Sequence, residues 1–396
     1  MGNSSIKTRL NNFLLLFAFS ALILESGSYL TILFLNKLPF TMSLFYQMPA
    51  VTQAEYKEYL RRRDPRLGWP PPEQIGGEKY DTSGSRPIPS FPYPGTECVS
   101  LYGDSFTYGS DVDHEQAWSN KLSQMLGCRV ANFGVGGYGT DQAYLRFEGN
   151  VEDTAEISIL GVFPTNVIRN LTRNAYFVFG AFPTGFKPRF SYMEGELKQL
   201  PIPNVPVERL DEYLQSPEKF IKNDMLMPGT HYGPTLVKFP YSLSLARTVF
   251  HPRVVNWLRG RPSWIDYLSP GHPSTGHEVL IGIVNKFVNS CEARNRKCMV
   301  LLFSTPMSYK YFQDQGISAF SEITKVLKAR GIAHLDLGKE IADRYGNQSY
   351  CDLIAAPDAC GGHFNPHGNE VVAEIMYDYL VKNSWMHMRQ PQHTSR

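Results

Sequence analysis

The chain has 396 residues, enough for one large domain or two modest ones. Lysine and arginine number 39 and aspartate and glutamate 37, so the net charge of +2 gives no electrostatic argument for a nucleic-acid partner. Glycine (32) and proline (28) are frequent and indicate many loops around a core.

The amino-terminal segment, residues 1–36, predicts a membrane helix. Lys7 and Arg9 precede an apolar run at 13–24, and a second apolar run follows it. One interpretation is a cleaved signal peptide. We favour an uncleaved signal anchor over about 13–35, because no small-x-small cleavage site follows the first run cleanly.

One acidic and two basic residues bear on this anchor. Glu25 lies inside the span, where a carboxylate costs a few kcal/mol on the insertion scale. The basic residues before the span place the amino end in the cytoplasm and the rest of the chain outside. We therefore expect a membrane-anchored protein with a periplasmic or extracellular domain.

Six cysteines fit an oxidising compartment. Their sequence contexts suggest three local bridges, although sequence alone leaves the connectivity open. The cysteine spacings, with no histidine nearby at the spacing of a metal ligand, fit a zinc site poorly. The expected pairs are Cys98–Cys128, Cys291–Cys298 and Cys351–Cys360.

Residues 37–96 are rich in proline and glycine and are expected to form a stalk and lead-in. From 97 to 385, short apolar runs alternate with helical patterns, which predicts βαβ units and a three-layer α/β/α domain with a five-stranded parallel sheet. A polar tail follows at 386–396. Strands are predicted at 98–103, 129–133, 156–162, 298–304 and 332–336, and helices at 114–127, 141–149, 276–295, 318–330, 338–345 and 366–383.

A segment at about 172–272 interrupts this alternation. It has patches of helical period around 206–227 and 239–258. We interpret it as an insertion that forms a rim or lid over the carboxyl edge of the sheet.

Four polar segments follow predicted strands or precede the last helix. The carboxyl edge of an open α/β sheet is where ligands bind, so these segments can meet there. They are Gly103-Asp104-Ser105 after the first strand, Asn132 to Gly139 after the second, Gly161 to Asn166 after the third, and Gly361 to Asn369 before the last helix.

This set, in this order, resembles the SGNH (GDSL-type) hydrolase superfamily over about 97–170 and 273–385. The resemblance implies a flavodoxin-like sheet and four site residues. It makes Ser105 the nucleophile and His363 the base, with Gly137 and Asn166 in the oxyanion site. More loosely, the anchor, lead-in and insertion look like membrane-tethered members found with bacterial exopolysaccharide systems.

The residue chemistry agrees with this assignment. Acyl transfer needs a hydroxyl activated by a base, and histidine has a suitable pKa. The backbone N–H groups of Ser105 and Gly137 and the side-chain amide of Asn166 can serve as donors to an oxyanion. Asn365-Pro366 predicts a helix cap followed by proline at the first helical position, which would fix the loop that holds His363.

Each residue also has a structural interpretation. Ser105 can be a turn residue, Asn166 a cap and His363 an ordinary loop histidine. His367 competes as the base, but it falls inside the first helical turn and is expected to face solvent. Asp104 is expected to organise its loop rather than act as a catalytic acid.

Two departures from the family pattern stand out. Family members usually carry an aspartate two or three residues before the histidine, where this chain has Gly361 and Cys360. We expect either that Asp358 orients His363, if the cysteine bridge folds the loop back, or that a backbone carbonyl does so. The third block is also longer than the usual Gly-x-Asn-Asp and lacks its second acid.

The leading hypothesis is a membrane-anchored serine esterase that acts outside the cytoplasm on an acylated, for example O-acetylated, glycan. A second hypothesis is a polysaccharide O-acetyltransferase with the same acyl-enzyme. A third is a glycan-binding scaffold with an impaired site, motivated by Gly361 and Cys360. No metal or organic cofactor is implied, and the oligomeric state is left open.

Overall fold

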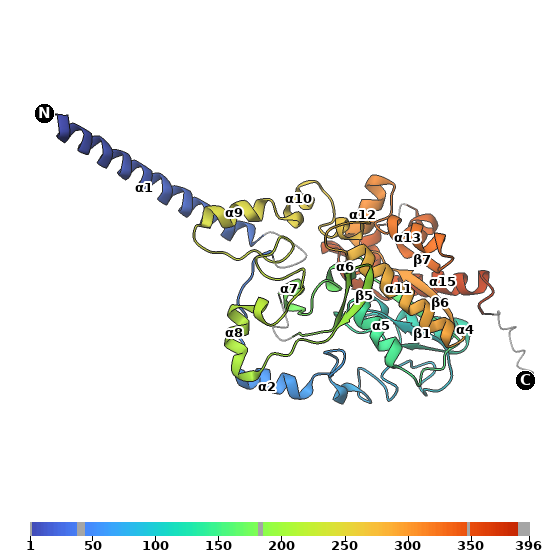
Figure 1. Ribbon diagram of the computed structural model, residues 1–396. Coiled ribbons are helices and arrows are strands. Elements are labelled where there is room, and N and C mark those ends of the chain that lie inside the picture. The colour runs from blue at the N-terminus through green and yellow to red at the C-terminus, as the bar shows by residue number, and fades with distance from the viewer. Residues whose placement is uncertain (1, 38–43, 181–184, 347–348, 387–396) are drawn as a thin grey trace, which may run out of the picture.

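The computed structural model describes residues 2–37, 44–180, 185–346 and 349–386 (Figure 1). All but the first residue of the predicted polar tail lies outside these ranges. A five-stranded parallel sheet forms the centre, with the strand order β2-β1-β3-β6-β7. The predicted strands are confirmed: they are β1 (Glu97–Tyr102), β2 (Arg129–Asn132), β3 (Ile157–Val162), β6 (Lys297–Leu302) and β7 (Ala333–Asp336).

The direction of winding reverses between β1 and β3, which pair directly with Tyr102 opposite Leu160. In doubly wound sheets the crevice outside the strand ends at such a reversal binds ligands. Ser105 follows β1 and Asn166 follows β3, so the topology brings two of the expected site residues to this position.

The strands carry apolar side chains on both faces, as strands of a sheet covered on two sides do. In β3, Ile157 and Ile159 enter one core, whereas Leu160 and Val162 enter the other. The predicted helices form and divide between these two cores. The first core is covered by α4 (Trp118–Leu126), α14 (Leu337–Tyr345) and α15 (Pro366–Lys382), and the second by α5 (Thr140–Gly149), α11 (Gly276–Ala293) and α13 (Ser321–Ala329).

The segment before β1, expected to form a stalk and lead-in, packs in part against the domain. It contains α2 (Gln53–Arg62), and Tyr56, Leu67 and Tyr80 are buried in the same core as α5 and α11. These apolar side chains, in a stretch whose sequence shows no local helical or strand pattern, are thus buried by packing against elements distant in the sequence.

The insertion forms short elements rather than long helices. A hairpin of β4 (Arg189–Met193) and β5 (Glu196–Leu200) contacts α11. The remaining pieces gather on the side of the molecule from which the amino-terminal helix leaves (Figure 1). They include α8 (Leu210–Gln215), α9 (Tyr241–Val249) and α10 (Pro252–Leu258).

The first helix, α1 (Gly2–Leu35), extends away from the rest of the molecule (Figure 1). Its residues 9–35 are long and apolar enough to cross a membrane, and they include an 18-residue window with a mean hydropathy of 1.8, of which 6% is buried. The three expected disulfides are present: Cys98–Cys128, Cys291–Cys298 and Cys351–Cys360 have Cα separations of 6.0, 6.2 and 4.8 Å.

Candidate active site

Ser105 is the first residue of a short helix, α3 (Ser105–Tyr108), at the carboxyl end of β1. Asp104 caps this helix, because its carboxylate accepts a hydrogen bond of 2.9 Å from the backbone N–H of Phe106. Ser105 itself is 8% exposed. The expectation that Asp104 organises the loop is therefore confirmed.

The loop after β2 approaches α3 closely. A Cβ at Gly134 would lie 2.5 Å from the backbone nitrogen of Tyr108, so only glycine fits there. Gly137 has a φ of +78°, in the left-handed region that glycine adopts without strain. Within the described residues, the backbone N–H groups of Ser105 and Gly137 donate no hydrogen bond, so both are free to bind an oxyanion.

Asn166 begins α6 (Asn166–Arg169) after β3. Its amide group donates to Asp104 Oδ2 and to the carbonyl of Tyr138, each at 3.1 Å. Its Oδ1 accepts from the backbone N–H of Phe163 at 2.6 Å. Because each amide hydrogen has an acceptor here, Asn166 joins the first two loops rather than presenting the free donor that we expected.

Arg169 joins the same two loops, a role that the sequence did not predict. Its Nη1 donates to Asp104 Oδ2 at 3.1 Å and to the carbonyl of Tyr138 at 2.9 Å. Burial lowers the pKa of Arg169, and the neighbouring Asp104 carboxylate opposes that effect. The guanidinium lies 5.5 and 5.1 Å from the ring centres of Phe163 and Phe179. This buried ion pair holds the residue that caps the serine helix.

His363 lies on β9 (Gly361–Phe364), which pairs with β8 (Ile354–Ala356) in a hairpin that packs against α3. The centre of its ring is 4.8 Å from that of Phe106, the residue after the serine. The predicted cap is confirmed: the side chain of Asn365 accepts from the backbone N–H of Gly368 at 2.8 Å, at the start of α15. His367 is exposed, as expected.

The carboxylate that orients His363 is Asp111, not Asp358. Asp111 Oδ2 accepts from His363 Nδ1 at 2.9 Å and from the His363 backbone N–H at 3.1 Å. Partial desolvation raises the pKa of Asp111, but the hydrogen bonds from His363 outweigh it and lower the pKa below its usual value. Asp358 is exposed and makes no side-chain hydrogen bond or ion pair in the described part of the chain.

Glycine again permits this contact. A Cβ at Gly362 would lie 3.2 Å from Asp111 Oδ2, and Gly362 has a φ of +89°. The residue directly before His363 is thus a glycine that admits a carboxylate from another loop.

Ser105, the expected nucleophile, and His363, the expected base, lie on elements that pack together, but they are not hydrogen-bonded to each other. Across the described residues, neither Ser105 Oγ nor His363 Nε2 makes a hydrogen bond. Such contacts are often long without a substrate and tighten when one binds. With Nδ1 held by a carboxylate, Nε2 is the nitrogen left to accept a proton.

Arg86, in the lead-in segment before β1, binds the loop that includes Asp111. The Arg86 guanidinium, 1% exposed, donates to the carbonyls of Tyr108 and Val112 at 2.7 Å and of Gly109 at 2.5 Å. These carbonyls run from the last residue of the serine helix to the residue after Asp111, so Arg86 positions the stretch that includes Asp111.

Two aromatic rings flank the second loop. Trp69 donates from Nε1 to the carbonyl of Gly136 at 2.9 Å. A Cβ at Gly137 would meet the ring of Trp69 at 3.7 Å and that of Phe179 at 4.0 Å. Both rings are partly exposed, so they offer an apolar surface next to the free N–H of Gly137.

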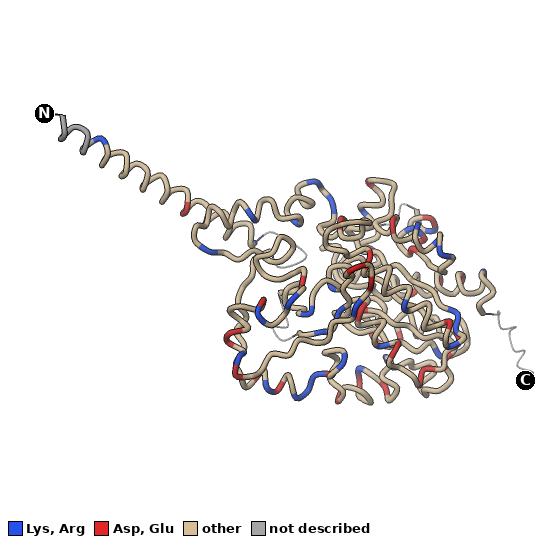
Figure 2. Tube along the Cα trace, in the orientation of Figure 1, with Lys and Arg blue, Asp and Glu red and all other residues tan. Residues whose placement is uncertain are grey.

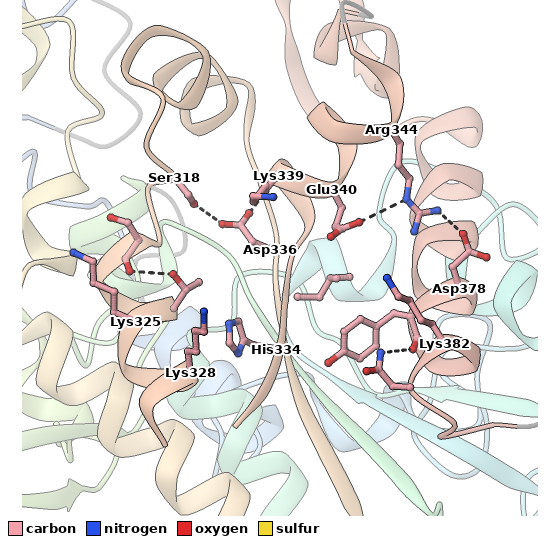
Figure 3. A pocket seen from close by; sticks show the side chains of 15 residues that line it. Ser318, Lys325, Lys328, His334, Asp336, Lys339, Glu340, Arg344, Asp378 and Lys382 are labelled. Carbon is pink, nitrogen blue, oxygen red and sulfur yellow. Dashed lines mark hydrogen bonds and ion pairs between the residues drawn. The ribbon is translucent and has the colours of Figure 1, made fainter. Parts of the chain in front are cut away.

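A pocket of about 590 Å³ lies elsewhere, along β7 between α13, α14 and α15 (Figure 3). Of its charged groups, Arg344 pairs with Asp378 and Glu340. It contains neither Ser105 nor His363, and no serine in it meets a histidine, so it does not suit acyl transfer.

No protein family and no curated protein matches the sequence. Among the solved structures that are similar in part are the following two. One is a protein of the G-D-S-L lipolytic family from Desulfitobacterium hafniense DCB-2, with 13% identity, coverage of 72% of this chain and 98% of that one, and a TM-score of 0.34. The other is a protein from Lactobacillus plantarum, with 10% identity, coverage of 73% and 99%, and a TM-score of 0.32. At these TM-scores neither likeness carries an argument about activity.

Proposed function

We propose that this chain is a serine ester hydrolase of the SGNH type. The observation that carries the proposal is the His363 ring, which a carboxylate holds through Nδ1 while the ring packs beside the helix that begins at Ser105. An acid, a histidine and a serine in this relation are the parts of an acyl-transfer site.

The mechanism follows from the groups present. Ser105 Oγ attacks the ester carbonyl while His363 Nε2 takes the hydroxyl proton, and the free N–H groups of Ser105 and Gly137 bind the oxyanion. His363 then returns the proton to the departing alcohol, which leaves an acyl-serine that water hydrolyses. Asp111 stabilises the imidazolium that forms in between.

The scaffold hypothesis rested on the missing aspartate before His363. Asp111 supplies a carboxylate to Nδ1 from a different loop, so that reason for an impaired site no longer applies. We therefore prefer the enzyme.

For the substrate we propose an acylated glycan outside the cytoplasm. The partly exposed rings of Trp69 and Phe179 next to Gly137 suit the apolar face of a sugar. The three disulfides and the apolar α1 fit a membrane-anchored domain in an oxidising compartment.

The test is hydrolysis of p-nitrophenyl acetate by the purified full-length protein in detergent. We expect Ser105→Ala to reduce kcat to background, because it removes the hydroxyl that forms the acyl-enzyme. His363→Ala should do nearly the same, because it removes the base that takes up and returns the proton. Wild-type activity equal to that of a folded Ser105→Ala protein would refute the proposal.

Transfer to a sugar hydroxyl uses the same acyl-enzyme. Incubation with an acetylated donor and an oligosaccharide acceptor, followed by mass spectrometry, separates the two activities. Free acetate indicates hydrolysis, and acetylated acceptor that forms only with intact Ser105 indicates transfer.

A further inference from the structure

The insertion exposes an apolar surface beside the root of α1. On α9 and its flanks three large apolar side chains are exposed: Phe239 is 72% exposed, Leu243 51% and Phe250 74%. On α10, Trp257 is 45% exposed and Leu258 65%. A helix on a water-facing surface shows the opposite pattern, with polar side chains outward.

This surface is continuous with the apolar surface of α1. Glu25, Ser28, Ile32 and Leu35 recur at helical spacing on the side of α1 that is partly or fully buried, and α1 contacts α9. The other side of the same helix remains open, with Leu30 64% exposed and Phe34 63% exposed. Figure 1 shows α9 and α10 next to the base of α1.

Glu25 fixes α9 to α1. Its carboxylate accepts from the backbone N–H of Tyr241 and from the hydroxyl of Ser242, and from the backbone N–H of Ser242 at 3.3 Å. These donors stand at the start of α9, where backbone N–H groups have no partner within the helix. The charge that made the span costly is therefore bound by the insertion.

The position of Glu25 along α1 gives the depth. Glu25 follows Arg9 by 16 residues. At about 1.5 Å per residue this is about 24 Å of helix, against a hydrocarbon core of about 30 Å. If Arg9 marks the cytoplasmic boundary, Glu25 and the start of α9 lie close to the opposite one.

The charge of this segment is one-sided. Residues 225–265 contain five basic residues and no acidic residue, in a chain that is otherwise nearly balanced. Lys238, Arg247 and Arg259 are exposed, and none of them joins an ion pair in the part of the chain that the structure describes. Along α9 and α10, Figure 2 shows blue and no red. Basic side chains around an apolar patch are typical of helices that lie in the interface of anionic membranes.

We propose that α9 and α10 lie in the outer interface of the same bilayer that α1 crosses. Phe239, Leu243, Phe250 and Leu258 enter the acyl region, and Lys238, Arg247 and Arg259 meet anionic headgroups. The proposal rests on α1 as a membrane span, and it makes the insertion a second attachment that holds the domain against the membrane.

Photo-crosslinking of the full-length protein in vesicles of phosphatidylethanolamine and phosphatidylglycerol tests this. Benzoylphenylalanine replaces Phe250 in one variant and Tyr93, an aromatic residue that is 81% exposed near β1, in the matched control. We expect several-fold more lipid adducts at position 250. Equal lipid labelling at the two positions, or an adduct at 250 that consists of a second copy of the chain, would overturn the proposal.

A second measurement uses the unsubstituted chain. Brominated phospholipids quench tryptophan that lies in the acyl region, so we expect quenching that Trp257→Phe removes in part. Quenching that is the same in the parent and in Trp257→Phe would count against insertion of α10. Resistance to extraction by alkaline carbonate tests the span of α1 separately.

Discussion

Asp111 has a left-handed backbone conformation with a φ of 70°, which non-glycine residues seldom adopt. The loop that holds it is bonded to Arg86, and its carboxylate bonds to His363, 252 residues away. Such a residue has no local signature other than its place six residues after the serine. Its role depends on a contact that only the folded chain makes.

Replacement of this carboxylate gives the sharpest prediction for a single residue. We expect Asp111→Asn to lower kcat for p-nitrophenyl acetate by about 10²–10⁴, because loss of the orienting carboxylate of a triad can cost about 10⁴. The matched control is Asp358→Asn, which should keep full activity. The opposite ranking of the two variants would restore Asp358 as the orienting acid.

The sequence suggested Ser105 and Gly137 by their places after strands and His363 by its place before the last helix, and the structure brings the loops of all three together. It could not show which acceptors the amide of Asn166 meets. That depends on the Tyr138 carbonyl and on Asp104, which approach from two other loops.

At the scale of single elements, the start of α10 is capped by a buried histidine. His251 Nδ1 accepts from the backbone N–H of Arg253 at 3.2 Å, and Nε2 donates to the carbonyl of Gly233 at 3.1 Å. Burial lowers the pKa of His251 to about 3, and the charge of Arg253 adds to this effect. The ring is therefore neutral in the folded protein.

This element should make the fold sensitive to acid. In the unfolded chain His251 binds a proton near pH 6.5, so stability falls as the pH drops from 6.5 toward 3, by about 2 kcal/mol at pH 5. Denaturant unfolding at pH 7 and pH 5 measures the loss. His251→Asn keeps a capping side chain without the titration, and a pH dependence equal to that of the parent would contradict the assignment.

The β4–β5 hairpin shows what pattern reading missed in the insertion. Glu194 and Gly195 both have positive φ, at 55° and 83°, as the two central residues of a tight hairpin turn do. A Glu-Gly pair is a weaker turn signal than Asn-Gly, and the flanking strands have charged and polar side chains. The hairpin packs against α11, and this tertiary contact stabilises it.

Across the whole molecule, a buried ion pair joins the insertion to the sheet layers. Lys187 Nζ lies 2.5 Å from Asp141 Oδ2, and the two side chains are 1% and 0% exposed. Asp141 belongs to α5, whereas Lys187 precedes β4. Burial raises the pKa of Asp141 and lowers that of Lys187, and in each case the charge of the partner opposes the change.

Removal of one partner should loosen this connection. We expect Lys187→Met to reduce the free energy of unfolding by about 3–5 kcal/mol, since it leaves Asp141 buried without its counter-charge. The measurement is urea unfolding of the full-length protein. The double variant Asp141→Asn/Lys187→Met should recover part of the loss, and a double variant as unstable as the single one would show that the charge is not the cause.

The sheet could be predicted because short apolar runs alternate with helical patterns at regular intervals. The lead-in could not be predicted, because its proline-rich sequence looks like a spacer. Only the fold shows that Tyr56 fills a core, that Arg86 binds the loop that includes Asp111, and that Trp69 borders the candidate site. Sequence patterns indicate local structure, whereas these three residues contact residues that are distant in the sequence.

The Cys351–Cys360 bridge closes the small hairpin that presents His363. Thiols stay reduced in the cytoplasm and pair after export. A chain that has not reached an oxidising compartment therefore lacks the covalent bond that closes the hairpin around His363. Under the proposed function, this timing would protect the cell's own esters during synthesis, since the enzyme would be completed only in the compartment that holds its substrate.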